Sequence, residues 1–130
     1  MDIKDKVILV VDDMQPVLDL LKNFFNSKFK CTVHTENDSH NAIKKALKIV
    51  PDLIILDVAM PDKSGDQIAN DIKKFTQLSK TKLIFFSGIF TSIDEALKYN
   101  HSNPKYICVP KTTPLSEFEK IIKEILSDKL

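Results

Sequence analysis

Side chains that could perform chemistry follow four apolar segments of this sequence. In chain order they are Asp12 and Asp13, Asp57, Ser87 and Lys111. Three carboxylates held together repel one another unless a cation joins them, and a hard divalent ion with oxygen ligands, above all Mg²⁺, meets that demand. An ammonium and a hydroxyl group can contact the oxygens of a phosphoryl group. The set is therefore the one that phosphoryl transfer requires, since catalysis there is mostly positioning and charge neutralisation.

Asp57 is the central residue of this set. It ends the branched apolar run 53–56 and is followed by a turn containing Met60 and Pro61. A carboxylate is a weak nucleophile, but near a metal ion and a cation it can accept a phosphoryl group. The alternative interpretation of this stretch alone is an ordinary turn acid that closes a strand.

The elements that must position these residues alternate regularly. Strands are predicted at 7–11, 31–35, 53–56, 82–87 and 106–110, and a helical segment follows each of them, with the fourth helix at 91–99. Such alternation predicts one α/β domain with a parallel sheet covered by helices on both faces. The short, less apolar strand 31–35 suits an edge. Right-handed crossovers bring the carboxyl ends of the strands, and hence the five polar residues, to one rim.

The overall composition favours a single soluble domain. The chain has 130 residues, 43% of them hydrophobic and 28% charged, with a net charge of +1. This balance offers no electrostatic footprint for nucleic acid or an anionic membrane. The sequence shows no membrane-spanning run and no signal peptide, so we expect a cytoplasmic protein. The last predicted helix reaches the end of the sequence, so we expect no output domain. Cys31 and Cys108 lie in strand-like runs and are expected to be buried thiols.

At this point the sequence resembles the receiver domains of two-component response regulators, the CheY-like superfamily. The acidic pair, the segment Asp57–Pro61, Gly65, Ser87–Gly88 and Lys111 match in order and approximate spacing over essentially the whole chain, 1–130. The resemblance implies a flavodoxin-like, doubly wound (βα)5 fold with strand order 2-1-3-4-5.

The resemblance also implies roles for individual residues. Asp57 would be the phosphoacceptor, and Ser87 and Lys111 would contact the phosphoryl oxygens. Mg²⁺ would be bound by Asp13, Asp57 and the Ala59 backbone carbonyl, with Asp12 assisting through water. The implied phosphodonor is a histidine kinase or a histidine phosphotransfer protein. Signalling to a downstream protein would follow from a changed surface of helix four, strand five and helix five. Such a domain catalyses only its own phosphorylation and dephosphorylation.

The sequence departs from the family pattern near Lys111. Many receivers have a cis proline bond after this lysine, whereas here Thr112 follows and we expect a trans bond. Many also carry an aromatic switch residue three positions before the lysine, where this chain has Cys108. Tyr106, two residues earlier on the same strand face, either replaces that aromatic or is a packed strand residue.

Other classes of function fit the sequence less well. A Mg²⁺-dependent phosphohydrolase would place a second acid two residues after the nucleophile, where this chain has Ala59. A dinucleotide-binding module would need a glycine-rich first turn, and only Gly65 and Gly88 exist. The remaining alternative is a degenerate receiver that acts as a scaffold without phosphorylation.

Two further positions bear on the lifetime of a phosphoaspartate. In the family, the residues two after the phosphoacceptor and two after the serine flank the attacking water. Here they are Ala59 and Ile89, and neither side chain can hydrogen-bond to water. We therefore expect slow self-dephosphorylation.

Overall fold

A five-stranded parallel sheet forms the centre of the molecule. The computed structural model describes residues 5–88 and 107–127. The sheet order is β2-β1-β3-β4-β5, and all neighbouring strands pair in parallel. The strands are β1 (Val7–Val11), β2 (Thr32–Glu36), β3 (Leu53–Leu56), β4 (Lys82–Ser87) and β5 (Ile107–Pro110). Both the alternating α/β architecture and the strand order are as expected from the sequence.

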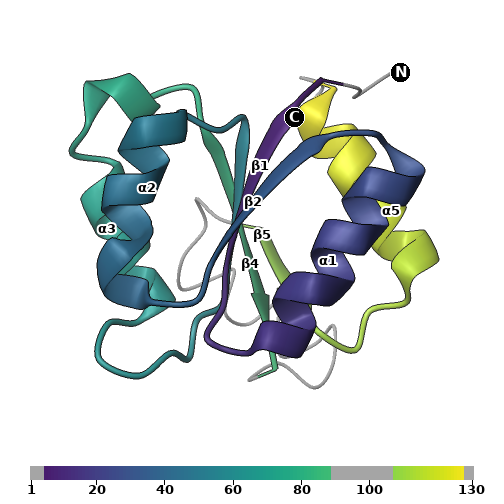
Figure 1. The fold of residues 1–130 in the computed structure, drawn as a ribbon, viewed down its shortest axis with the longest axis horizontal. Helices are drawn as coiled ribbons and strands as arrows, with labels where there is room; N and C mark the ends of the chain where they lie inside the picture. Colours follow the sequence, from purple (N-terminus) through teal and green to yellow (C-terminus); the bar gives the residue numbers. More distant parts are fainter. Residues whose placement is uncertain (1–4, 89–106, 128–130) are drawn as a thin grey trace.

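Helices cover the two faces of the sheet in pairs, which gives three layers (Figure 1). One face carries α1 (Gln15–Lys28) and α5 (Leu115–Leu126), and the other carries α2 (Ala42–Ile49) and α3 (Gly65–Ile72). Two short 3-10 helices, η1 (Ser39–Asn41) and η2 (Thr76–Leu78), precede α2 and β4. The helix expected at 91–99 lies outside the described residues.

The strand sequences explain why there are two hydrophobic cores. Because successive side chains of a strand point to opposite faces, Ile8 and Val10 pack under α1 and α5, while Leu9 and Val11 pack under α2 and α3. β3 is buried along its whole length, as expected for a strand covered on both faces. The strand expected at the edge, β2, is only partly buried and does lie at the edge.

Local boundaries differ slightly from those expected. The second strand was expected at 31–35 and is found at Thr32–Glu36, and the third helical segment, α3, begins at Gly65 and ends at Ile72. Its start is defined by a capping box, in which the Ser64 hydroxyl accepts from the Gln67 N–H and the Gln67 side chain accepts from the Ser64 N–H. β5 begins at Ile107 within the described residues, and Tyr106 lies outside them.

Parallel pairing brings the carboxyl ends of the strands to one edge of the sheet. In the register of the sheet, Val11 lies opposite Leu56, Leu56 opposite Phe85, and Ser87 opposite Pro110. The residue that follows each of β1, β3 and β5 therefore emerges at the same rim as Ser87. This is where ligands bind in open α/β sheets.

Candidate phosphoacceptor and metal site

Three carboxylates meet at this rim. Asp12 and Asp13 follow β1 and Asp57 follows β3, and one oxygen from each lies within 4.8 Å of the others. Asp12 and Asp57 are buried, while Asp13 is exposed. A set of carboxylate oxygens open to solvent on one side suits a small hard cation that keeps some of its water ligands, as Mg²⁺ does. The chemistry of the donor set therefore fits the metal suggested by the sequence.

Asp57 is held from three directions. Its Oδ1 accepts hydrogen bonds from the Ser87 hydroxyl at 2.8 Å and from the Ala59 N–H at 3.3 Å. Its Oδ2 lies 3.4 Å from Lys111 Nζ. The Asp57 N–H donates to the Val11 carbonyl at 3.0 Å, which extends the β1–β3 pairing up to the carboxylate. Asp57 thus has a defined orientation with a hydroxyl on one oxygen and a cation beside the other.

Lys111 bridges two of the carboxylates. Its Nζ lies 2.8 Å from Asp12 Oδ2 as well as 3.4 Å from Asp57 Oδ2. Burial by itself lowers the pKa of Lys111, but the contacts with Asp12 and Asp57 outweigh burial and the pKa is raised. The pKa of Asp12 is also raised, chiefly because burial disfavours the charged carboxylate, and the charge of Asp57 adds to this. Lys111 therefore remains protonated, but its one positive charge does not balance the negative charges of the three carboxylates.

The loop between β3 and α3, residues 57–64, is tightly constrained; we call it the acceptor loop. The Gly65 N–H donates to the Val58 carbonyl at 3.0 Å, and a Cβ at Gly65 would lie 2.3 Å from the Asp57 carbonyl oxygen. Only glycine allows this approach. In the middle of the loop the Lys63 N–H donates to the Pro61 carbonyl at 2.7 Å, and Asp62 between them has a φ of 69°. This is a γ-turn with positive φ, a strained conformation for a non-glycine residue.

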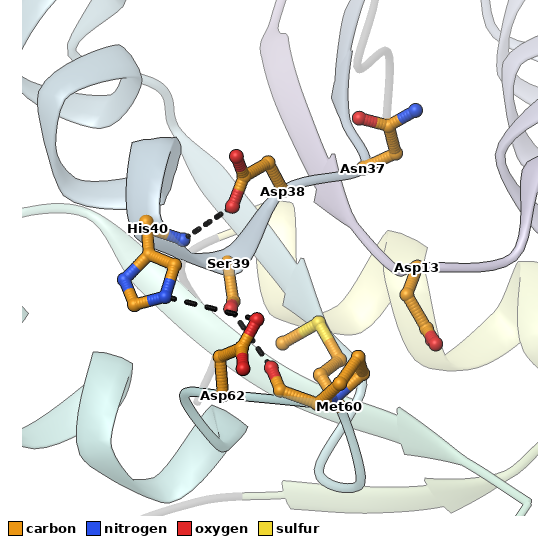
Figure 2. Close-up of a pocket in the computed structure, with 8 residues that line it drawn as sticks. Asp13, Asn37, Asp38, Ser39, His40, Met60 and Asp62 are labelled. Carbon is orange, nitrogen blue, oxygen red and sulfur yellow. Dashed lines mark hydrogen bonds and ion pairs between the residues drawn. The ribbon is translucent and has the colours of Figure 1, made fainter.

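A pocket of about 270 Å³ lies beside the acceptor loop (Figure 2). It separates the tip of the loop from the segment between β2 and α2, and Asp13 forms part of its wall. Within it, Ser39 Oγ donates to the Pro61 carbonyl at 3.2 Å, and His40 Nε2 lies 3.9 Å from Asp62 Oδ2. The full lining is Asp13, Asn37, Asp38, Ser39, His40, Met60, Pro61 and Asp62.

The structure thus brings together all five polar residues singled out from the sequence. Ala59, whose carbonyl is the expected metal ligand, is exposed in the same loop. Ile89 lies outside the described residues. No peptide bond among the described residues is cis, so the bond between Lys111 and Thr112 is trans, as expected. Cys31 and Cys108 are buried thiols that form no disulfide, also as expected, and burial raises the pKa of Cys108 to about 12.

Sequence reasoning missed the residues that support the acceptor loop from outside. Ser39 contacts Pro61, 22 positions away in the chain, and nothing in the local sequence signals that contact. The Lys63–Asp71 ion pair, 2.7 Å long, ties the loop to α3 and was also missed. The Ser64 cap could have been found, since Ser64 and Gln67 have the spacing of a capping box.

A doubly wound parallel sheet with a buried carboxylate, a hydroxyl and a lysine at its carboxyl edge defines a class of signalling domain. The family model of the response regulator receiver domain matches residues 8–123. The chain therefore belongs to the receiver domain family of two-component response regulators.

Relatives and solved structures agree with this assignment. The chain is 38% identical over 92 residues to the alkaline phosphatase synthesis transcriptional regulatory protein PhoP of Bacillus subtilis (strain 168), covering 70% of the chain and 35% of that relative. The chain therefore spans about a third of the length of this relative.

Two solved structures show the same fold. A signal receiver domain of a DNA binding response regulator from Colwellia psychrerythraea 34H matches with a TM-score of 0.80 and 22% identity, covering 95% of this chain and 100% of that one. The chemotaxis protein CheY4 of Vibrio cholerae matches with a TM-score of 0.79 and 21% identity, covering 93% of this chain and 98% of that one. Among the described residues, no helix is long and apolar enough to cross a membrane.

Proposed function

We propose that this receiver domain accepts a phosphoryl group on Asp57 from a histidine kinase or a histidine phosphotransfer protein. The observation that carries the proposal is the environment of Asp57. This buried carboxylate has the Ser87 hydroxyl 2.8 Å from one oxygen and the Lys111 ammonium 3.4 Å from the other. It also lies beside the carboxylates of Asp12 and Asp13.

The proposal gives a task to each side chain. An Asp57 carboxylate oxygen attacks phosphorus as the phosphorus–nitrogen bond to the donor histidine breaks, and the donor nitrogen keeps the bonding electron pair. Lys111 balances part of the negative charge that arrives with the phosphoryl group. Ser87, which now donates to Asp57 Oδ1, is close enough to the reacting carboxylate to redirect its hydrogen bond to a phosphoryl oxygen.

Mg²⁺ is the proposed cofactor. When bound, it would neutralise charge on both the carboxylates and the phosphoryl oxygens. Asp13, Asp57 and the Ala59 carbonyl would hold it, with Asp12 assisting through water. Asp12 is already paired with Lys111 at 2.8 Å, which agrees with an indirect role for this carboxylate.

The proposed output is a changed surface that includes β5 and α5. Ser87 pairs with Pro110 of β5, and the Lys111 N–H donates to the Ser87 carbonyl at 3.1 Å, so a movement of Ser87 is passed directly to the end of β5. Ile107 and Leu115 are exposed apolar side chains on this part of the molecule and would contact a downstream protein.

Phosphorylation by a small-molecule phosphodonor, followed by intact-mass measurement, tests the proposal. The parent protein should gain one phosphoryl mass with Mg²⁺ and little without it, and Asp57→Asn should gain none. Asp62→Asn is a matched control, because Asp62 is an exposed carboxylate of the same loop. Labelling that persists in Asp57→Asn would exclude Asp57 as the acceptor, and an unlabelled parent protein would favour the phosphorylation-independent scaffold.

The lifetime of the phosphorylated state is a second measurable consequence. We expect slow self-dephosphorylation, because Ala59 and Ile89 offer no group that could orient the attacking water. After the donor is removed, the parent protein should lose its label more slowly than the double variant Ala59→Asn/Ile89→Glu. Equal rates of decay would show that these two positions do not control hydrolysis.

A further inference from the structure

The carbonyl of Pro61 accepts two hydrogen bonds. One comes from the Lys63 N–H within the γ-turn at 2.7 Å, and the other comes from Ser39 Oγ at 3.2 Å. Because a carbonyl oxygen has two lone pairs, Pro61 uses its full accepting capacity. The second bond joins the tip of the acceptor loop to the segment that begins α2.

Ser39 is itself held in place. Its side chain is buried, with 5% of the residue exposed. It is the first residue of η1, and Asp38 caps this helix by accepting from the His40 N–H at 2.9 Å. Figure 2 shows the Ser39 side chain pointing toward the segment that carries Met60 and Asp62. A hydroxyl on a capped helical turn is a rigid donor, so the position of Pro61 is set from outside its own loop.

The neighbouring pocket makes the hydrogen bond from Ser39 to Pro61 more important for the position of the loop. Pro61 and Asp62, at the tip of the loop, are exposed and border a hollow of about 270 Å³, so core packing does not hold these two residues on that side. The neighbouring contact between His40 and Asp62 joins two largely exposed side chains 3.9 Å apart, and such pairs contribute little. The Ser39–Pro61 hydrogen bond is part-buried and has a buried donor, so it is the stronger of the two contacts beside the pocket.

We propose that Ser39 is a positioning residue for the metal-binding part of the acceptor loop. By fixing Pro61, it holds the backbone two residues earlier, at Ala59, whose carbonyl is the proposed Mg²⁺ ligand. Mg²⁺ demands nearly ideal octahedral geometry, so a small displacement of one carbonyl weakens binding. This inference rests on the proposed function, because it takes the Ala59 carbonyl as a ligand.

The test is to measure the melting temperature by calorimetry at a series of Mg²⁺ concentrations. The dependence on concentration gives a dissociation constant for Mg²⁺ without any measurement of phosphorylation. Ser39→Ala should raise the dissociation constant by about three- to tenfold, the range expected for the loss of one net hydrogen bond. Ser39→Cys keeps a weak donor of similar size and should fall between Ser39→Ala and the parent protein.

The chain offers a matched control at the amino ends of the strands, opposite the rim that carries the site. Thr81 Oγ1 donates to the Pro51 carbonyl at 2.7 Å, a bond of the same chemical kind that lies before β3 and β4 rather than after them. Thr81→Val should lower the melting temperature without Mg²⁺ and leave the dissociation constant unchanged.

The outcomes separate the two proposals. A parent protein whose melting ignores Mg²⁺ would contradict the metal site in the proposed function. A parent protein that responds to Mg²⁺ while Ser39→Ala binds it equally well would overturn the role of Ser39 alone. Equal weakening of Mg²⁺ binding in Ser39→Ala and Thr81→Val would also overturn the role of Ser39, since a general loss of stability would then be the cause. If Ser39→Ala does not fold, Ser39→Cys decides between these outcomes.

Discussion

At the scale of single residues, the two glycines differ sharply in what they tolerate. A Cβ at Gly65 would lie 2.3 Å from the Asp57 carbonyl oxygen, whereas one at Gly88 would lie 3.9 Å from Lys111 Cδ, an ordinary contact. The oxygen that a Cβ at Gly65 would meet belongs to Asp57, the proposed phosphoacceptor. Gly65 therefore supports the site by its lack of a side chain.

Gly65→Ala should destabilise the fold by about 1–3 kcal/mol, the usual cost of forcing an extra carbon into a packed region. It should also slow phosphorylation of Asp57, because the Asp57 backbone must shift. Gly88→Ala serves as the control, with an expected change within about 0.5 kcal/mol. Urea unfolding and phosphodonor labelling measure the two effects, and equal stability of the two variants would contradict the close approach at Gly65.

A second prediction at the residue scale concerns the contribution of Asp71 to stability at low pH. The pKa of Asp71 is lowered, first by the hydrogen bond from Lys63 at 2.7 Å and further by the charges of Lys63 and Lys74. A carboxylate whose pKa is lower in the folded state stabilises the fold above its ordinary pKa of 3.8. That contribution is lost as the pH falls through the folded-state value, which lies below 3.8.

Asp71→Asn should therefore be less stable than the parent protein by a few tenths to about 1 kcal/mol near neutral pH, since the pair is partly exposed. The difference should vanish at about pH 2. Urea unfolding across this range measures it, and Lys63→Met, which removes the main partner, should show the same convergence. A difference that stays constant with pH would mean that the ion pair is not its source.

At the scale of elements, the backbone at the C-terminal end of α2 has an unfavourable conformation. Its C-cap, Val50, adopts the left-handed conformation with φ 45° and ψ 69°, and the Val50 N–H donates to the Ala46 carbonyl. Glycine is the usual residue at such an end, whereas a β-branched side chain is strained there. Val50 is also 49% exposed, so replacing it removes little buried surface.

Val50→Gly should raise the free energy of unfolding by about 0.5–1 kcal/mol, because relief of strain exceeds the extra entropy of the unfolded chain. Lys48→Gly, two residues earlier at an exposed position in the last turn of α2, should lower it by a similar amount. Chemical denaturation of both variants checks the opposite signs. Destabilisation by Val50→Gly would show that its side chain makes a favourable contact.

At the scale of the whole molecule, the fold gathers three carboxylates at one rim, and the described part of the chain does not fully balance their negative charge. Within residues 5–88 and 107–127, Asp12, Asp13 and Asp57 share one rim with a single close cation, Lys111. A ligand that binds only the folded state stabilises it, so Mg²⁺ should raise the melting temperature. At a Mg²⁺ concentration a hundred times the dissociation constant, the free energy of unfolding should rise by about 2.7 kcal/mol.

Asp13→Ala should remove most of this response. Without Mg²⁺, the variant should be at least as stable as the parent protein, because Asp13 is exposed and its loss relieves repulsion. Melting curves with and without Mg²⁺ measure both effects. An unchanged Mg²⁺ response in Asp13→Ala would exclude Asp13 as a ligand.

The sequence by itself determined the class of fold and which side chains gather at the candidate site. Apolar runs such as Val7–Val11 and Leu53–Leu56 are local signals that predict buried parallel strands, and both strands form as expected. Parallel connections then require the residues after these strands to meet at one rim. Asp57, Ser87 and Lys111 could for this reason be grouped before any contact was known, and they do lie together.

Only the tertiary structure decided how the acceptor loop is held. The bond between Ser39 and Pro61 and the approach of Gly65 to the Asp57 carbonyl depend on how separately formed elements pack against one another. The same is true of the raised pKa of Asp12, which results mainly from burial. Periodicity and spacing describe what one segment does along its own axis. They carry no information about a hydroxyl and a carbonyl that meet 22 residues apart, because that distance is set by the packing of α2 and the sheet.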